Sequence, residues 1–213
     1  MNTYALALFL LGSTSQLDSG CLLVLEGHNK PVRAFTGSSV THVALVMNST
    51  KRYPMVYEAA PGRVRCVSLD KYLAEIRRFN AARRKKTSVW VMRPKRPYSR
   101  QQLTRMQSYL DSQLGRRYSV KGYVRKRPTD GIHCAEFAST ALMCTGRFQF
   151  RERYRLSPGE LIEQIESRHD GPYRVKLPTR QPSPSWPKRT WHRWLDFQSW
   201  CLWAYWEAFR FCW

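Results

Sequence analysis

Two short apolar segments on either side of a polar loop are the feature that most constrains the fold. The segments VTHVALVM (40–47) and YPMVYEA (53–59) are rich in β-branched, aromatic and other apolar residues, and NSTKR separates them. Strand-like runs that flank a short polar loop are typical of a β-hairpin. We therefore predict an antiparallel pair of strands around a five-residue loop.

Further segments extend this hairpin to a mixed α+β fold. Apolar runs bounded by turn residues predict strands at 21–27, 63–69 and 87–93. Helical spacing predicts helices at 68–79, at 99–115, from about 130 to 146, and at 157–167. The helix at 99–115 has the clearest pattern, since Ser99 can cap its start and Gly115 can end it. Its apolar stripe consists of Leu103, Met106, Leu110 and Leu114.

The composition divides the 213 residues into one central domain, 17–180, and two attachments. Residues 1–16 contain an apolar run too short to cross a bilayer, which is either an export signal or a first core element. Residues 181–213 join a Pro-rich basic linker to a Trp-rich helix at 191–213. That helix either lies in a membrane surface or packs on the domain or on another subunit. We expect a membrane-associated or exported protein rather than a purely cytoplasmic one.

The charge of the chain favours acidic partners. It has 36 Lys and Arg against 15 Asp and Glu, a formal net charge of +21. Such a balance attracts nucleic acid, anionic lipid or an acidic polymer, and it does not decide the fold. The basic run RRYSVKGYVRKR (116–127) is either a solvated face or a binding surface whose aromatic rings alternate with Arg and Lys.

The predicted hairpin pairs a histidine with a carboxylate. If the loop is centred on residue 50, His42 lies directly opposite Glu58 on one face of the sheet, and Pro54 lies opposite Val46. A carboxylate beside a histidine fixes its tautomer and stabilises its protonated form. The pair is therefore either the base and orienting group of a catalytic triad or a cross-strand polar pair without chemistry.

Cys134 is the candidate nucleophile. In GIHCAEFASTAL (131–142), Thr129 or Asp130 can cap a helix whose first turn holds this cysteine. The N–H groups and positive dipole at a helix start favour a thiolate. The adjacent His133 is expected to point elsewhere and is not assigned as the base. The alternative is a small buried cysteine, an interpretation that suits Cys144 better. No cysteine or histidine spacing in the chain matches a zinc site.

The order of these motifs resembles a known family. SSVTHVALV, VYEA, LGRRYS, HCAEFAS and LSPGEL follow one another between about Gly20 and Leu161. This order is similar to that of the permuted papain-like amidases of the YiiX type, within the NlpC-type superfamily, in which the histidine precedes the cysteine. The chain departs from the family pattern at Cys21, Ala44 and Ser119, which leaves the substrate class open.

The resemblance implies a small antiparallel sheet packed against helices, with the catalytic cysteine at a helix N-terminus. It implies Cys134 as nucleophile, His42 as base and Glu58 as orienting carboxylate, with Tyr118 lining the site or helping an oxyanion. The implied reaction is hydrolysis of an amide or ester bond without metal or organic cofactor, on a substrate such as a peptidoglycan peptide or a lipid. The alternative is a non-catalytic basic module that binds anionic lipid or, less favoured, nucleic acid.

Overall fold

The structure is a computed structural model that describes residues 17–27, 33, 36–48, 53–82 and 86–177. The predicted leader at 1–16 and the predicted tail at 181–213 lie outside the described residues. Among the described residues, no helix is both long enough and apolar enough to cross a membrane.

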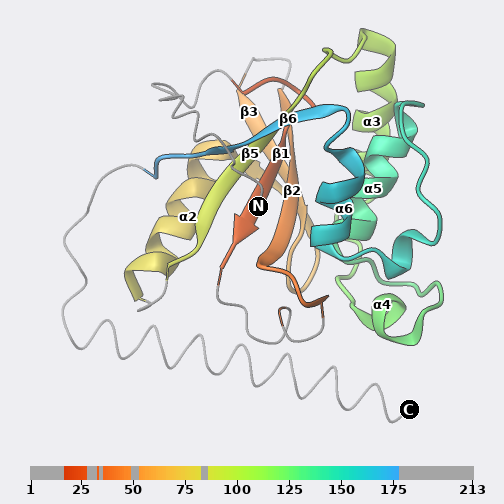
Figure 1. The fold of residues 1–213 in the computed structure, drawn as a ribbon, viewed down its shortest axis with the longest axis horizontal. Helices are drawn as coiled ribbons and strands as arrows, with labels where there is room; N and C mark the ends of the chain where they lie inside the picture. The colour runs from red at the N-terminus through yellow and green to blue at the C-terminus, as the bar shows by residue number, and fades with distance from the viewer. Residues whose placement is uncertain (1–16, 28–32, 34–35, 49–52, 83–85, 178–213) are drawn as a thin grey trace, which may run out of the picture.

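A single antiparallel sheet forms the centre of the domain (Figure 1). Among the described residues it has six strands, in the order β4-β3-β2-β1-β5-β6. The strands are β1 (Leu22–Glu26), β2 (Val40–Asn48), β3 (Pro54–Ala59), β4 (Val64–Ser68), β5 (Ser88–Pro94) and β6 (His169–Arg174). The predicted α+β class, with an antiparallel sheet packed against helices, is therefore confirmed.

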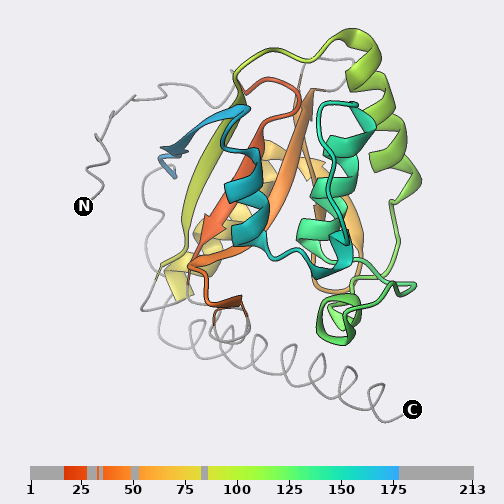
Figure 2. The same ribbon diagram turned by 45° about the vertical axis from the view of Figure 1, so that its right-hand side comes forward.

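Helices cover both faces of the sheet (Figures 1 and 2). On one face lies α2 (Leu69–Ala82), whose apolar side chains pack on the side of the sheet that carries Leu23, Val46 and Val56. The other face holds the larger core and is covered by α3 (Arg100–Ser112), α5 (Cys134–Cys144) and α6 (Pro158–Ile165). Two short helical turns, α4 (Lys121–Arg125) and η2 (Arg153–Arg155), flank the start of α5 and the segment before α6.

Local sequence explains where the two best-predicted helices begin. Ser99 accepts a hydrogen bond from the Gln102 N–H, and the Gln102 side chain returns one to the Ser99 N–H. The same reciprocal cap joins Ser157 and Glu160 at the start of α6. Helix α3 ends at Ser112, so the predicted extension of its apolar stripe to Leu114 is wrong, and that side chain is 44% exposed.

The predicted hairpin forms, but its register differs by two residues from the prediction. Val46 lies opposite Val56, and Pro54 lies opposite Asn48 rather than Val46. The reason is that Tyr53 belongs to the loop, so that β3 begins at Pro54. At the first residue of a strand, the missing backbone N–H of proline costs the ladder at most one hydrogen bond. Because side chains alternate with a period of two, a shift of two residues keeps His42 and Glu58 on the same face.

Candidate active site

Glu58 is held in a chain of ion pairs on the α2 face of the sheet. It lies opposite Arg65 in the β3–β4 ladder, and the Arg65 Nε donates to Glu58 Oε1 at 2.7 Å. The Arg65 Nη2 also donates to Glu75 of α2 at 2.7 Å. Glu58 itself is 3% exposed. The carboxylate is therefore fixed by a cross-strand arginine that is anchored in turn to a helix.

His42 reaches Glu58 diagonally across the hairpin. Its Nε2 lies 2.6 Å from Glu58 Oε2, and its side chain is 19% exposed. In the observed register the two residues are not directly opposed, and diagonal neighbours are further apart at Cβ, about 7–8 Å. Two long side chains close this gap. Because Nε2 faces Glu58, Nδ1 is the ring nitrogen left to contact Cys134.

Cys134 is the first residue of α5 and is 4% exposed. The N-cap is His133, so the predicted caps Thr129 and Asp130 are wrong, although the cysteine does lie in the first turn. The segment before it is pinned by close backbone packing, because a Cβ on Gly131 would lie 2.3 Å from the Ser119 Cβ. Only glycine allows this approach of the two segments.

Both ring nitrogens of His133 have structural partners. Its Nδ1 accepts a hydrogen bond from the Glu136 N–H, and its Nε2 lies 3.1 Å from the Tyr154 carbonyl oxygen, to which it can donate. This arrangement suits the tautomer with the proton on Nε2. His133 therefore caps the helix. The prediction that its side chain points away from Cys134 is wrong, because His133 also forms a hydrogen bond with the thiol that lowers the pKa of Cys134.

Cys134 and His42 meet although they start from opposite faces of the sheet. Strand alternation puts His42 on the α2 face, whereas Cys134 belongs to the core beneath α5. The paired residues of β2 and β3 run from Asn48–Pro54 only as far as Leu45–Tyr57. Beyond that point the two strands no longer form a ladder, and α5, which contacts both of them, brings its first residue to His42.

The contact between these two side chains sets their charges. Burial raises the pKa of the Cys134 thiol, but the positive charge of His42 and the hydrogen bonds of His133 and His42 outweigh burial and lower the pKa to about 6. Burial lowers the pKa of His42, but the Cys134 thiolate and the Glu58 carboxylate raise it to about 10. The favoured state at neutral pH is therefore a thiolate–imidazolium pair.

Glu58 remains ionised in this setting. Burial raises its pKa, but the hydrogen bonds and charges of His42 and Arg65 lower it below its ordinary value. The carboxylate can therefore stabilise a protonated His42 throughout the neutral range. A base oriented by a third group in this way is the arrangement that nucleophilic catalysis requires.

The other described cysteines differ from Cys134. Cys21, Cys66 and Cys144 are free thiols, and burial raises the pKa of each, that of Cys21 to about 12. Cys134 is thus the one described cysteine whose pKa is lowered. Within the described part of the chain, no group of three or more His, Cys, Asp or Glu side chains is placed to hold a metal ion.

The backbone of Tyr118 lies near the segment that leads into Cys134. It forms an isolated bridge with Ile132, two residues before Cys134, and its N–H donates to the Gly62 carbonyl. Its partly buried side chain packs against the larger core. The prediction that Tyr118 lines the site stays a prediction.

Sequence reasoning missed Arg65 and Glu75. The sequence does contain a signal for the arginine, because a tight turn centred on Pro61 and Gly62 places residue 65 opposite Glu58. Glu75 has no comparable signal, since its approach depends on how α2 crosses the sheet.

The fold is similar to that of a solved structure, the metalloprotein YiiX (DUF1105) from Escherichia coli O157:H7. The two structures superpose with a TM-score of 0.51 over 78% of this chain and 99% of the YiiX chain, at 16% sequence identity. No protein-family model matches the sequence, and no curated protein matches it either. The comparison therefore establishes a YiiX-like fold.

Proposed function

We propose that this protein is a cysteine hydrolase that cleaves an amide or ester bond through an acyl-enzyme on Cys134. The observation that carries the proposal is the contact between the Cys134 thiolate and a His42 ring held by Glu58 at 2.6 Å. The YiiX-like fold and the motif order of the permuted, NlpC-type amidases support the same assignment. Three side chains from β2, β3 and α5 then act as nucleophile, base and orienting group.

The first half of the reaction forms the acyl-enzyme. The Cys134 thiolate attacks the substrate carbonyl carbon, and the electron pair of the carbonyl bond moves to oxygen. The N–H of Cys134, in the first turn of α5 where backbone donors have no intrahelical partner, can donate to that oxyanion. As the oxyanion collapses, the bond to the leaving amine or alcohol breaks, and His42 gives that group its proton.

The second half releases the acid and restores the enzyme. The neutral His42 takes a proton from water, and the resulting hydroxide attacks the thioester carbonyl. Collapse of this second oxyanion breaks the carbon–sulfur bond and returns the thiolate beside a protonated His42. Glu58 stabilises the imidazolium at both stages without accepting its proton. His42 is therefore protonated before the first half-reaction, neutral in the acyl-enzyme, and protonated again after the second half-reaction.

Trapping the acyl-enzyme tests the proposal. The protein is mixed with p-nitrophenyl acetate, quenched in acid, and its intact mass and tryptic peptides are measured. We expect one acetyl group on Cys134 during turnover and a burst of p-nitrophenol equal to the enzyme concentration. Cys134→Ala abolishes both, whereas Cys144→Ala, at the other end of the same helix, leaves them unchanged. Acetylation on another residue, or turnover that survives Cys134→Ala, contradicts the proposal.

A second candidate function is binding to an anionic surface. The stretch 116–127 contains six basic residues and no acidic one. The backbones of Arg117 and Arg63 form an isolated antiparallel β-bridge. Both residues are exposed, and they lie next to the segment that leads into Cys134. Substrates at such a rim are expected to be anionic, for example a lipid headgroup or an acidic cell-wall peptide.

Vesicle binding separates the two candidates. Sedimentation with phosphatidylcholine vesicles, with and without phosphatidylglycerol, is measured for wild type and for Arg117→Gln. We expect binding only to the anionic vesicles, with weaker binding in Arg117→Gln and no change in the control Arg155→Gln. Vesicle binding without acylation of Cys134 favours a non-catalytic module. Displacement by a short oligonucleotide at equal charge favours nucleic acid as the partner.

A further inference from the structure

The two oxygens of the Glu58 carboxylate are bonded to different cations. Oε2 lies 2.6 Å from His42 Nε2, and Oε1 lies 2.7 Å from the Arg65 Nε and 2.6 Å from its Nη2. Glu58 is buried, whereas the Arg65 side chain is 38% exposed. An imidazolium can lose its proton, but a guanidinium in a protein does not. The carboxylate is therefore held between one cation whose charge changes and one whose charge is permanent.

This difference matters once the acyl-enzyme has formed. In the proposed hydrolysis, on which this inference rests, His42 has then given its proton to the leaving group, and the Cys134 thiolate has become a thioester. Glu58 is left as a buried charge beside a neutral ring. Because a buried charge without a partner is costly, such a carboxylate draws a proton back to its neighbour. A ring that is protonated again cannot take a proton from the attacking water.

Arg65 is the bonded cation that remains beside Glu58 at this stage. In the described part of the chain, the charged or titratable side chains that face Glu58, His42 or their partners include Arg65 of β4, Tyr72 and Glu75 of α2, Cys134 of α5 and the adjacent cap His133. Burial raises the pKa of the Tyr72 phenol well above its ordinary value, so this group stays neutral. Glu75 accepts a hydrogen bond from the Arg65 Nη2 at 2.7 Å and offsets part of its charge.

We propose that Arg65 is a positioning residue that acts through Glu58: its charge balances the carboxylate in the acyl-enzyme and so lets His42 stay neutral for the attack of water. Removal of Arg65 is then expected to raise the pKa of His42, and removal of Glu75 to lower it. An arginine that only held Glu58 in place would have the opposite effect. Its loss would loosen the contact between Glu58 and His42 and would lower the pKa of the ring.

Nitrogen NMR of His42 in the full chain measures this balance without turnover. The Cys134→Ala background is used because it lacks the thiolate, as the acyl-enzyme does. Adding Arg65→Gln is expected to raise the pKa of His42 by about half a unit or more, whereas adding Glu75→Gln lowers it. Arg65→Lys keeps the charge and is expected to leave the pKa of His42 close to that of Cys134→Ala alone.

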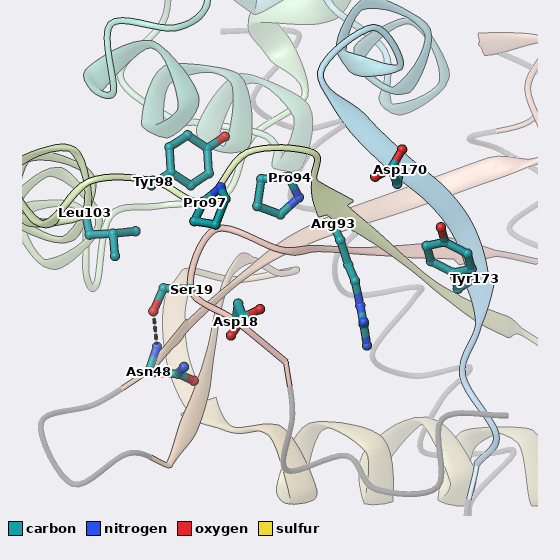
Figure 3. A pocket seen from close by; sticks show the side chains of 10 residues that line it. All are labelled: Asp18, Ser19, Asn48, Arg93, Pro94, Pro97, Tyr98, Leu103, Asp170 and Tyr173. Carbon is teal, nitrogen blue, oxygen red and sulfur yellow. Dashed lines mark hydrogen bonds between the residues drawn. The ribbon is translucent and has the colours of Figure 1, made fainter. Parts of the chain in front are cut away.

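Two control variants make the same changes of charge at the other end of the sheet. Asp170→Asn removes an exposed carboxylate from the lining of a cavity of about 600 Å³, which Figure 3 shows. Arg168→Gln removes an exposed guanidinium close to it in the chain. The cavity is also lined by Asn48, which lies about 20 Å along β2 from His42. Exposed charges at such distances are screened, so neither control is expected to move the titration of His42.

Turnover of p-nitrophenyl acetate shows whether the balance matters for the second half-reaction. In Arg65→Gln with Cys134 intact, we expect the burst to remain and the pH midpoint of deacetylation to move upward by about the same half unit. Below that midpoint, deacetylation then slows about threefold, since half a pKa unit corresponds to that factor. Acetylated Cys134 is therefore expected to accumulate in this variant.

Two failures can be told apart. The inference is overturned if Arg65→Gln lowers the pKa of His42 or leaves it unchanged, if Glu75→Gln shifts it in the same direction as Arg65→Gln, or if the midpoint of deacetylation does not move. The proposed hydrolase function fails in another way, because the wild type then forms no acetylated Cys134, whatever Arg65→Gln does to the titration of His42.

Discussion

Replacing Glu58 by glutamine tests how strongly the orienting carboxylate controls His42. The substitution keeps the shape of the side chain and removes its charge. In the wild type, the 2.6 Å contact from His42 Nε2 to this 3% exposed carboxylate is a charge-assisted hydrogen bond. Such bonds contribute about 1.5–3 kcal/mol, and one pKa unit corresponds to about 1.4 kcal/mol. The substitution is therefore expected to lower the pKa of His42 by about one to two units.

The direction of the shift follows from what the carboxylate stabilises. Glu58 favours the protonated ring and is among the groups that raise the pKa of His42 to about 10. In Glu58→Gln the ring therefore loses its second proton at a lower pH. A glutamine amide can also donate to Nε2, which favours the tautomer with the proton on Nδ1. That tautomer has no lone pair on the nitrogen that faces Cys134 and cannot take a proton there. The rate of the proposed hydrolysis is therefore expected to fall by at least the factor that corresponds to the pKa shift.

Nitrogen NMR of the imidazole rings measures both effects directly. The spectra report the pKa and the tautomer of each histidine as the pH is raised. We expect a downward shift for His42 in Glu58→Gln and no change in Glu152→Gln, where an exposed ion pair with Arg155 is removed instead. An unchanged titration of His42 in Glu58→Gln refutes the role given to the carboxylate.

Three predictions concern stability. Because the pKa of Glu58 is lower in the folded state, its contribution to the free energy of unfolding is present above about pH 4.5 and is lost as the pH falls through the folded pKa. In urea unfolding, the stability of Glu58→Gln should therefore decrease less than that of the wild type as the pH is lowered. Ser157→Ala removes the cap of α6 and should lower the unfolding free energy by about 1 kcal/mol in the same assay, with no change contradicting the cap. Leu110→Ala, in the core, should cost about 2–5 kcal/mol, whereas the exposed Leu114→Ala should stay within about 0.5 kcal/mol.

The sequence predicts the central sheet and the long helices because their patterns are local. Strand runs at 40–47 and 53–59 lie within two residues of β2 and β3, and Ser99 caps α3 as expected. Strand β6 was missed because HDGPYR reads as a turn. Its glycine and proline are tolerated because it is an edge strand, paired only with β5 among the described strands.

The contact between His42 and Glu58 was predicted for reasons that are partly wrong. His42 and Glu58 share a face because the register error was even, although the pair is diagonal rather than directly opposed. The meeting of His42 with Cys134 depends on the end of the β2–β3 ladder and on the packing of α5, which no local pattern encodes. The expected approach of His42 to Cys134 came from the motif order of the family that the chain resembles. The sequence contains no signal that favours His133 over Asp130 as the cap of α5.

The pH dependence of Cys134 alkylation tests the central claim most directly. Reaction with iodoacetamide is followed by mass spectrometry of the tryptic peptide 127–147, in which Cys144, with its raised pKa, serves as an internal control. We predict that wild-type Cys134 reacts with a midpoint near pH 6, and that His42→Ala moves this midpoint upward by at least one unit while Cys144 is unaffected. A midpoint near that of an ordinary thiol in the wild type, or one that does not respond to His42→Ala, contradicts the activated thiolate–imidazolium pair.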